Sequence, residues 1–343
     1  MHHGEPFRQA FDIHHQETDM TKRLSLLPLL FALLFAGLFP WAGAHAQDYP
    51  NKPIRFIYPY PAGGSGDNIM RLVADMLGPE LGGSVYVENR PGASGVVGTR
   101  TVAESAPDGY TLGLTSNGTH AAVMSLVKNP GYDPLKNFTH IGLFASLPWM
   151  LVVPAQQPFQ SVNDLVAWAR ANPGKLTMSH YSSSSRVLVH MLQTASKVQL
   201  TEVPYKAPGQ VITDLIGGQL QAAFLPMEIA MAQAAGGKMR VLGAASEKRQ
   251  PGAPQVPTIA EQLPGVALTS WMGMGAPAGL PPDVTTKLQS ALTRVLNKPE
   301  FRERLQKLSG DVLINTPAQI HARIREEMAM WAKFAKEAGV QPE

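Results

Sequence analysis

Two hydrophobic patterns alternate along this chain: short apolar runs typical of buried strands, and longer stretches with apolar residues three or four positions apart. The first pair is the clearest, because the apolar run 54–60 leads through the glycine-rich segment 61–66 into an amphipathic stretch. The apolar residues of that stretch are Ile69, Leu72, Val73, Met76 and Leu77. This spacing predicts a strand, a tight loop and a helix, for which Asp67 is the expected N-cap.

The alternation continues to the C-terminus and predicts an α/β protein with mainly parallel sheets. Further strands are expected at 85–88, 111–115, 141–144, 151–153, 176–179, 202–203, 222–224, 240–244 and 269–274, and helices at 162–171, 187–196, 211–216, 282–297, 300–308 and 317–338. Ser161 with Asp164 is the expected N-terminal cap of the first of these helices.

The order of these elements also predicts two lobes. The chain would leave a first lobe near 148–154 and return to it near 269–277, which inserts one lobe into the other. The expected division is residues 47–148 plus 272–343 for the first lobe and 149–271 for the second. Two α/β lobes joined by such a double hinge form a cleft that can close on a ligand.

The N-terminal segment has the pattern of an export signal. Lys22 and Arg23 precede a sixteen-residue, largely apolar run at 24–39, and Ala44-His45-Ala46 follows as an A-x-A cleavage pattern. A membrane span needs about 20 apolar residues, so an uncleaved anchor is the less favoured alternative. We expect residues 1–46 to be a leader that starts at Met20, is cleaved near Ala46/Gln47 and directs the protein to the periplasm.

Composition excludes several functional classes. The 343-residue chain has no cysteine, which excludes disulfides, thiolate metal sites and a lipid-anchored cysteine. Its net charge of +3 is mild and without the basic runs that nucleic acid requires. The histidines beyond the leader are scattered, and no nucleophile elbow occurs. We therefore expect no catalytic residue, no metal and no cofactor, with an exported hydrolase as the alternative.

The strongest candidate site is the loop after the first strand. Glycines allow close backbone approach, and the N-terminus of the following helix offers unpaired N–H groups to an anion. The alternative is a tight turn with a capping aspartate. The candidate ligand-binding residues here are Tyr60, Ala62, Gly63, Gly64, Ser65 and Asp67.

Three later segments could complete such a site. At the next strand end, hydroxyl and amide groups suit a carboxylate, although a solvated loop is equally consistent; the candidates are Ser116, Asn117, Thr119 and His120. Before the helix at 187, serines could cap that helix or hold an anion beside a cation; the candidates are Ser182, Ser183, Ser184 and Arg186. Tyr205, beside Lys206, and Met227 are candidates for the cleft wall.

An ordered set of short motifs resembles one known family. The motifs lie at residues 49–55, 59–64, 87–95, 106–111, 171–176, 203–206, 215–219 and 256–258, so the resemblance runs from about residue 48 to the C-terminus. The chain resembles the Bug family, the extracytoplasmic solute receptors of tripartite tricarboxylate transporters. The resemblance implies a type II periplasmic-binding-protein, or Venus-flytrap, fold. It also implies a monomer that binds a small carboxylate, partly through water, and passes it to membrane transporter subunits.

Two departures from the family pattern bear on the ligand. The chain has Ser182–Ser185 where relatives often have a glycine-rich segment, and Phe224-Leu225-Pro226 where many have Phe-Asp-Asn. Without that aspartate, an α-ammonium group would lack its natural partner. We therefore expect a non-amino di- or tricarboxylate. A ligand sensor that acts on a signalling partner is the remaining alternative to a transport receptor.

Overall fold

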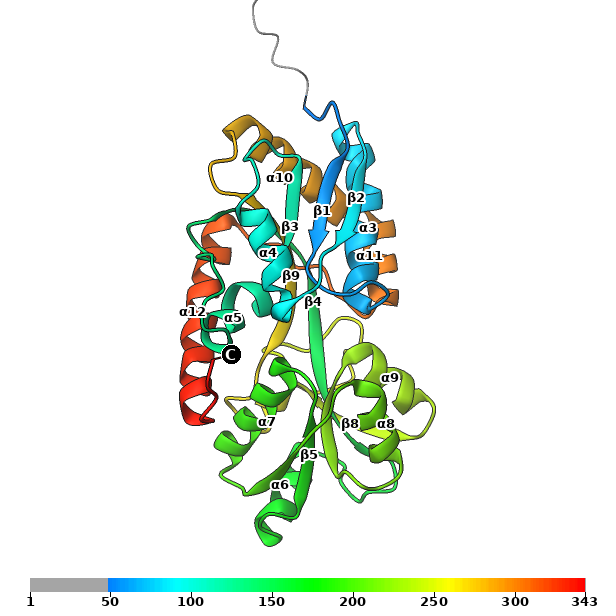
Figure 1. Ribbon diagram of the computed structural model, residues 1–343. Helices are drawn as coiled ribbons and strands as arrows, with labels where there is room; N and C mark the ends of the chain where they lie inside the picture. Colours follow the sequence, from blue (N-terminus) through cyan, green and yellow to red (C-terminus); the bar gives the residue numbers. More distant parts are fainter. Residues whose placement is uncertain (1–48, 343) are drawn as a thin grey trace, which may run out of the picture. The chain divides into compact units, whose positions relative to one another are not determined.

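The computed structural model describes residues 49–342, which form an α/β protein (Figure 1). Its strands are β1 Ile54–Tyr58, β2 Val85–Asn89, β3 Thr111–Ser116, β4 Phe138–Pro154, β5 Leu176–His180, β6 Leu200–Pro204, β7 Ala222–Pro226, β8 Met239–Ala244 and β9 Thr269–Pro277. Its helices are α3 Ser65–Leu81, α4 Val96–Ala103, α5 Val123–Leu126, α6 Val162–Ala171, α7 Ser183–Ser196, α8 Pro208–Ile216, α9 Met227–Ala235, α10 Pro282–Asn297, α11 Pro299–Lys307 and α12 Pro317–Glu337. Three short helices are η1 Ala93–Gly95, η2 Gly118–Ala122 and η3 Ile259–Glu261.

The strands form two sheets that share β4. In the first, called sheet A, β2, β1 and β3 are parallel, whereas β9 runs antiparallel to β3 and to β4. In the second, called sheet B, β6, β5 and β7 are parallel, whereas β7 and β8 are both antiparallel to β4. The expectation of mainly parallel sheets therefore holds among β1, β2 and β3 and among β5, β6 and β7, and it is wrong for every pair that β4 or β9 forms.

Strand β4 is the largest difference from the sequence-based expectation. Two separate strands were expected at 141–144 and 151–153, but Phe138–Pro154 is one strand of 17 residues. Its first part pairs with β9 as far as Pro148, opposite Thr269, and from Trp149 onward it pairs with β7. Pro148 lacks an N–H and lies where the strand changes its partner. The missing donor therefore does not end the strand.

Each sheet is covered by helices that bury an apolar face. Phe56 and Phe144 of sheet A lie in one core with Leu288 of α10 and Phe301 of α11. Both faces of sheet B are covered, one by a core that includes Leu188 of α7. The cores therefore hold β1, β3 and β5 firmly, and their carboxyl ends position the loops described below.

Helix α12 packs on groups from both sheets. Ile320 and Ile324 lie against Leu143 of β4, whereas Trp331 and Phe334 belong to the core on sheet B. In Figure 1 this red helix extends beside both halves of the described chain. The lobe boundaries at 148/149 and 271/272 remain predictions, and α12 would bridge the two lobes.

Local helix signals were confirmed at one helix and wrong at another. Helix α6 begins as expected, with Ser161 Oγ accepting a hydrogen bond from the Asp164 amide at 3.1 Å. Helix α3, however, begins at Ser65 with Gly64 as its N-cap, so Asp67 is not the cap. Helices α4 and α9 were not expected. Among residues 49–342, no helix is long and apolar enough to cross a membrane.

Three histidines, His120, His140 and His321, pack edge to face next to the β3–η2 turn. The ring centroid of His140 lies 5.5 Å from that of His120 and 5.0 Å from that of His321. His140 Nε2 donates to the Pro134 carbonyl at 3.0 Å, and its Nδ1 is buried without a partner among the described residues. Burial lowers the pKa of His140 to about 4 and places the pKa of His120 well below its usual value.

Acid should therefore destabilise the protein through His140. The imidazole binds a proton near pH 6.5 in the unfolded chain and only near pH 4 in the folded protein. The contribution of neutral His140 to the free energy of unfolding is therefore complete above pH 6.5 and is lost as the pH falls toward 4. The shift corresponds to about 3 kcal/mol. His140→Gln, which keeps a donor for Pro134, should flatten this dependence in urea unfolding measured across that pH range. His190→Gln, on α7, is the control that should retain it, and an unchanged slope in His140→Gln would contradict the assignment.

Candidate functional site

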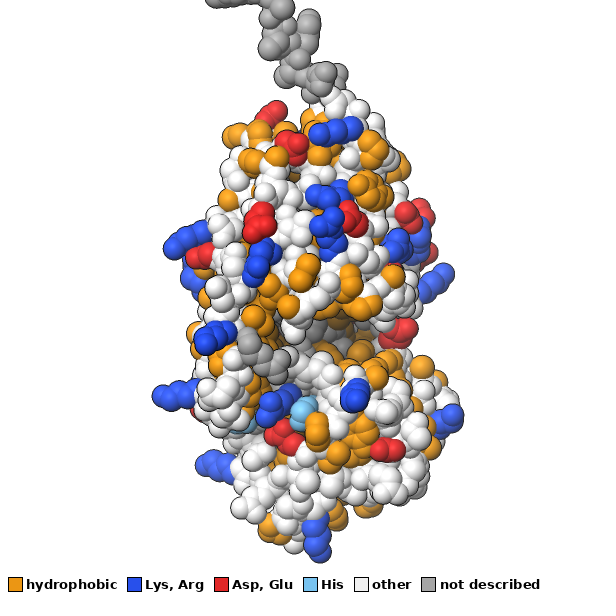
Figure 2. Space-filling model, in the orientation of Figure 1, with side chains coloured by type: hydrophobic (Ala, Val, Ile, Leu, Met, Phe, Trp, Pro, Cys, Tyr) orange, Lys and Arg blue, Asp and Glu red, His pale blue; other side chains and the backbone are white. Residues whose placement is uncertain are grey.

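Loops at the carboxyl ends of three strands surround one cavity of about 450 Å³. Tyr60 follows β1, Gly118 follows β3 and Ser182–Ser184 follow β5, so both sheets contribute to its wall. Figure 2 shows this face hollowed between the half built on sheet A and the half built on sheet B. Ligands of open α/β sheets bind in the crevice beyond the carboxyl ends of the strands, and this cavity occupies such a crevice.

A buried carboxylate fixes the loop between β1 and α3. Asp67 accepts hydrogen bonds from the Gly63 amide at 3.0 Å, from Arg71 Nε at 3.0 Å and from Asn89 Nδ2 at 2.8 Å. Burial alone would raise the pKa of Asp67, but the hydrogen bonds from Arg71, Asn89 and Gly63 outweigh it and lower the pKa. The ionised carboxylate therefore stabilises the loop and has no lone pair directed at a ligand in this arrangement.

The glycines of this loop face open space. A Cβ at Gly63 or Gly64 would contact no atom within 4 Å, and Gly63 has a φ of +89° that favours glycine. Ala62 beside them is also exposed. The first-turn N–H groups of α3 follow directly, and such groups have no partner within the helix. This loop can therefore bring its main chain close to a ligand.

Tyr60 lies between the loops of sheet A. A Cβ at Gly118 would come within 2.9 Å of its hydroxyl, and a Cβ at Gly95 within 3.3 Å of its ring. Burial raises the pKa of Tyr60, although a hydrogen bond with Ser116 opposes the shift. The phenol is therefore neutral at the pH of the cell and is a hydrogen-bond donor at the cavity wall.

Hydrogen bonds within the β3–η2 turn fix the part of the cavity wall that Gly118 forms. Thr119 Oγ1 lies 3.0 Å from Ser116 Oγ and 2.9 Å from His120 Nδ1, and the Thr119 carbonyl accepts from Tyr132 at 2.6 Å. Thr119 and His120 are fully buried and do not line the cavity. Asn117 is 5% exposed, and its Nδ2 has no partner among residues 49–342. Of these four candidates, Asn117 and His120 each keep a buried side-chain nitrogen without a partner among the described residues, Nδ2 and Nε2 respectively.

The serines before α7 divide between two roles. Ser182 Oγ accepts from the Ser185 amide at 3.2 Å while Ser185 Oγ accepts from the Ser182 amide at 3.0 Å, which forms a capping box. Ser183 and Ser184 begin the helix and line the cavity together with Ser182. Capping and anion binding were alternatives for this segment, and the capping role is present for Ser182 and Ser185.

Arg186 also lines the cavity, but its guanidinium already forms an ion pair with a carboxylate. Its Nε lies 3.7 Å from Glu202 Oε2, and His180 Nε2 lies 3.6 Å from the same oxygen. Burial lowers the pKa of His180, and Glu202 only partly offsets this. His180 is therefore mainly neutral at neutral pH, and Arg186 provides the positive charge in this group.

A second, smaller cavity of about 130 Å³ lies beside Ser65. Met227 and Pro226 line it, and the indole of Trp149 is fixed there by a 2.9 Å hydrogen bond to Ser270. Ser65 Oγ donates to Glu228 Oε2 at 2.8 Å, which joins the first turn of α3 to the first turn of α9. Tyr205 lies in neither cavity, since its hydroxyl donates to Asp214 of α8.

Sequence reasoning missed contributors to this site from at least three segments of the chain. Ser94 lines the larger cavity from a turn in which Gly92, Ala93, Ser94 and Gly95 all have positive φ angles. Glu228 faces Ser65 in the smaller cavity, and Val340 and Gln341 close one side of the larger cavity. The glycines at 92 and 95 were the available signal for the first contributor. No local pattern marks the other two.

The fold and the crevice define a two-lobed solute-binding protein. The periplasmic binding protein BugD aligns with a TM-score of 0.70 and 33% identity, covering 86% of this chain and all of BugD. A protein of R. palustris solved with adipate aligns with a TM-score of 0.74 and 30% identity, covering 86% of this chain and 100% of that one. The fold is accordingly that of a periplasmic binding protein.

The sequence comparisons then specify the family. The family model of the tripartite tricarboxylate transporter family receptor matches residues 69–340. Protein BugT of Bordetella pertussis is 31% identical over 327 residues, which covers 94% of this chain and 99% of BugT. The chain belongs to the tripartite tricarboxylate transporter receptors, the Bug family of solute-binding proteins, as its motifs indicated.

Proposed function

We propose that the protein is a periplasmic receptor that binds a small non-amino dicarboxylate and delivers it to the membrane subunits of a tripartite tricarboxylate-type transporter. The observation that carries this proposal is the cavity formed by Tyr60, Gly118 and Ser182–Ser184. Two helices, η2 and α7, begin at its wall, and helix N-termini attract anions without a cationic side chain.

The distribution of charge orients the ligand within this crevice. Arg186 lies on the side of the larger cavity, whereas Glu228 faces Ser65 in the smaller one. A carboxylate near Arg186 is favoured, and a carboxylate near Glu228 is repelled. We infer that the ligand places one carboxylate against the start of α7 and avoids Glu228 with the other. The relative solved with adipate supports a linear dicarboxylate of this kind.

The choice against amino acids has to account for Glu228. Leu225, at the position where the family pattern often has aspartate, is fully buried and offers no charge to the crevice. Glu228, three residues later, is exposed and could attract an ammonium group. Its carboxylate already accepts a hydrogen bond from Ser65, so the proposal remains a non-amino ligand. A variant without the Glu228 charge distinguishes the two kinds of ligand.

Replacing Gly64 with valine tests the binding loop. The position is open and has a φ of −83°, so Gly64→Val should fold normally while its side chain blocks ligand approach to the first turn of α3. Calorimetry should detect adipate or succinate binding to the wild type and a loss of at least about tenfold in the variant. Gly236→Val, at the C-terminal end of α9, is the matched control. Equal affinity in both variants would contradict the assignment of this loop.

Removing the Glu228 charge tests the identity of the ligand. Glu228→Gln should bind dicarboxylates about threefold to tenfold more tightly at low salt, because one repulsive charge is gone, and the gain should shrink as salt is added. Asp283→Asn removes a first-turn acid from α10 and should have no effect. Weaker binding of glutamate or aspartate by Glu228→Gln, with no dicarboxylate binding by the wild type, would instead identify an amino-acid receptor.

Export is tested by expression from Met20. Residues 1–48 lie outside the described residues, so the proposal of a leader rests on the sequence pattern. The protein should accumulate in the periplasmic fraction, and its intact mass should correspond to an N-terminus at or near Gln47. A mature protein that retains the apolar run 24–39 would show that the leader is not cleaved.

A further inference from the structure

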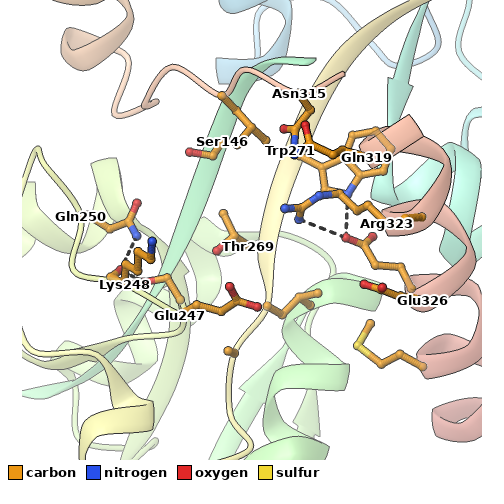
Figure 3. A pocket seen from close by; sticks show the side chains of 17 residues that line it. Ser146, Glu247, Lys248, Gln250, Thr269, Trp271, Asn315, Gln319, Arg323 and Glu326 are labelled. Carbon is orange, nitrogen blue, oxygen red and sulfur yellow. Dashed lines mark hydrogen bonds and ion pairs between the residues drawn. The ribbon is translucent and has the colours of Figure 1, made fainter. Parts of the chain in front are cut away.

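A cavity of about 600 Å³ is separate from the proposed carboxylate site. It lies between α12 and the loop that follows β8, and Figure 3 shows Glu247 and Lys248 on the wall opposite Arg323 and Glu326. None of its lining residues belongs to either cavity described above. Its volume falls in the range of small-molecule sites.

The alternation of side chains along β9 places this cavity behind the joining strands. Thr269 and Trp271 line it, whereas Ser270, between them, lines the small cavity beside Ser65. Successive side chains of a strand point to opposite faces. The 600 Å³ cavity, which we call the rear cavity, therefore lies on the opposite face of β9 from the small cavity of the crevice.

Two buried acceptors in the rear cavity lack donors. Glu327 Oε1 accepts from the Trp271 indole at 2.8 Å and lies 3.6 Å from Arg323. Glu327 Oε2 is buried without a partner, and so is Asn315 Oδ1. The Glu327 side chain is only 12% exposed. Buried acceptors are normally satisfied, and a ligand group that carries several N–H donors would satisfy these two.

The charges around the rear cavity favour a cation. Glu326 and Glu247 line it, and neither forms an ion pair within 4.0 Å among the described residues. Arg323 is already paired with Glu327, which leaves Lys248 as the remaining lining cation. Leu268, Leu313 and Met330 supply apolar surface between the polar groups. The lining therefore suits an aliphatic chain with positively charged ends.

We propose that the rear cavity binds an aliphatic diamine. One ammonium group donates to Glu327 Oε2 and Asn315 Oδ1, and the other lies near the carboxylates of Glu247 and Glu326. The methylene groups pack on the apolar wall. An ammonium has three donors and no acceptor, which matches the two unpartnered oxygens.

The protonation of Glu327 provides an independent signature. Burial raises the pKa of Glu327 to about 7, with Trp271 and Arg323 opposing the shift and Glu326 adding to it. The other charged groups of the cavity are Glu247 and Lys248. A diamine binds the ionised carboxylate, so its affinity should rise as the pH increases through about 7. Binding should also release a proton when it is measured near that pH.

Calorimetry with putrescine, a four-carbon diamine, tests the proposal. Wild-type protein should bind it at millimolar concentration or below, and butanediol and succinate of the same length should not compete for it. Glu327→Gln keeps the shape of the side chain and should weaken putrescine binding by about tenfold or more, because a charge-assisted hydrogen bond is lost. Glu303→Gln, an exposed residue of α11, is the matched control and should bind as the wild type does.

Asn315→Asp provides a second, opposite change. It adds a carboxylate beside the ammonium and should tighten putrescine binding, so the proposal can be tested even when Glu327→Gln folds poorly in thermal unfolding. No putrescine binding by the wild type would overturn the proposal, and so would equal binding by wild type and both cavity variants. Since Gly64 lies outside the rear cavity, putrescine binding that survives in Gly64→Val separates this outcome from the fate of the carboxylate site.

Discussion

The continuous pairing of β4 is the constraint on which the rest of the structure depends. Its seventeen residues belong to both sheets, so its backbone groups must be satisfied first by β9 and then by β7 and β8. A buried backbone group without a partner is rare, and this requirement fixes where the two sheets meet. Irregular pairing is confined to register shifts between His140 and Gly142, between Leu143 and Ala145, and between Leu151 and Val152.

The position of the crevice follows from that constraint. Strand β9 brings the chain back to sheet A beside β3, while β7 continues the pairing into sheet B beside β5. The carboxyl ends of β1, β3 and β5 therefore lie at one crevice, although they come from widely separated parts of the chain. The Asp67 network then holds the first of these loops, so the main chain there is ordered before a ligand arrives. Such preorganisation lowers the entropy lost on binding.

Short-range signals predicted much of this from the sequence. The cap that Ser161 forms with the Asp164 amide could be predicted at the start of α6 because the two residues lie within four positions of each other. Asp67 was predicted as the N-cap of α3 and is not, because its side chain instead bonds Arg71 of the same helix and Asn89 of β2. The antiparallel pairing of β4 and β9 has no local signal in the sequence. Pro148 was predicted to separate two strands, because only the tertiary structure shows that it lies where β4 changes its partner strand. Glu228 was missed for the same reason, since only the fold brings it to Ser65.

The topology also has a consequence for the order of assembly. All strands of sheet B lie between Phe138 and Ala244, so this sheet can form from one continuous segment. Sheet A begins earlier in the chain but is completed only by β9, and its core also needs Leu288 and Phe301 from the helices that follow. Contacts so distant in sequence form late, because closing a long loop carries an entropy penalty before the contacts are gained. We therefore expect β1 and β3 to keep apolar surface exposed until β9, α10 and α11 are present, and the core on sheet B to be completed later still, by Trp331 and Phe334 of α12.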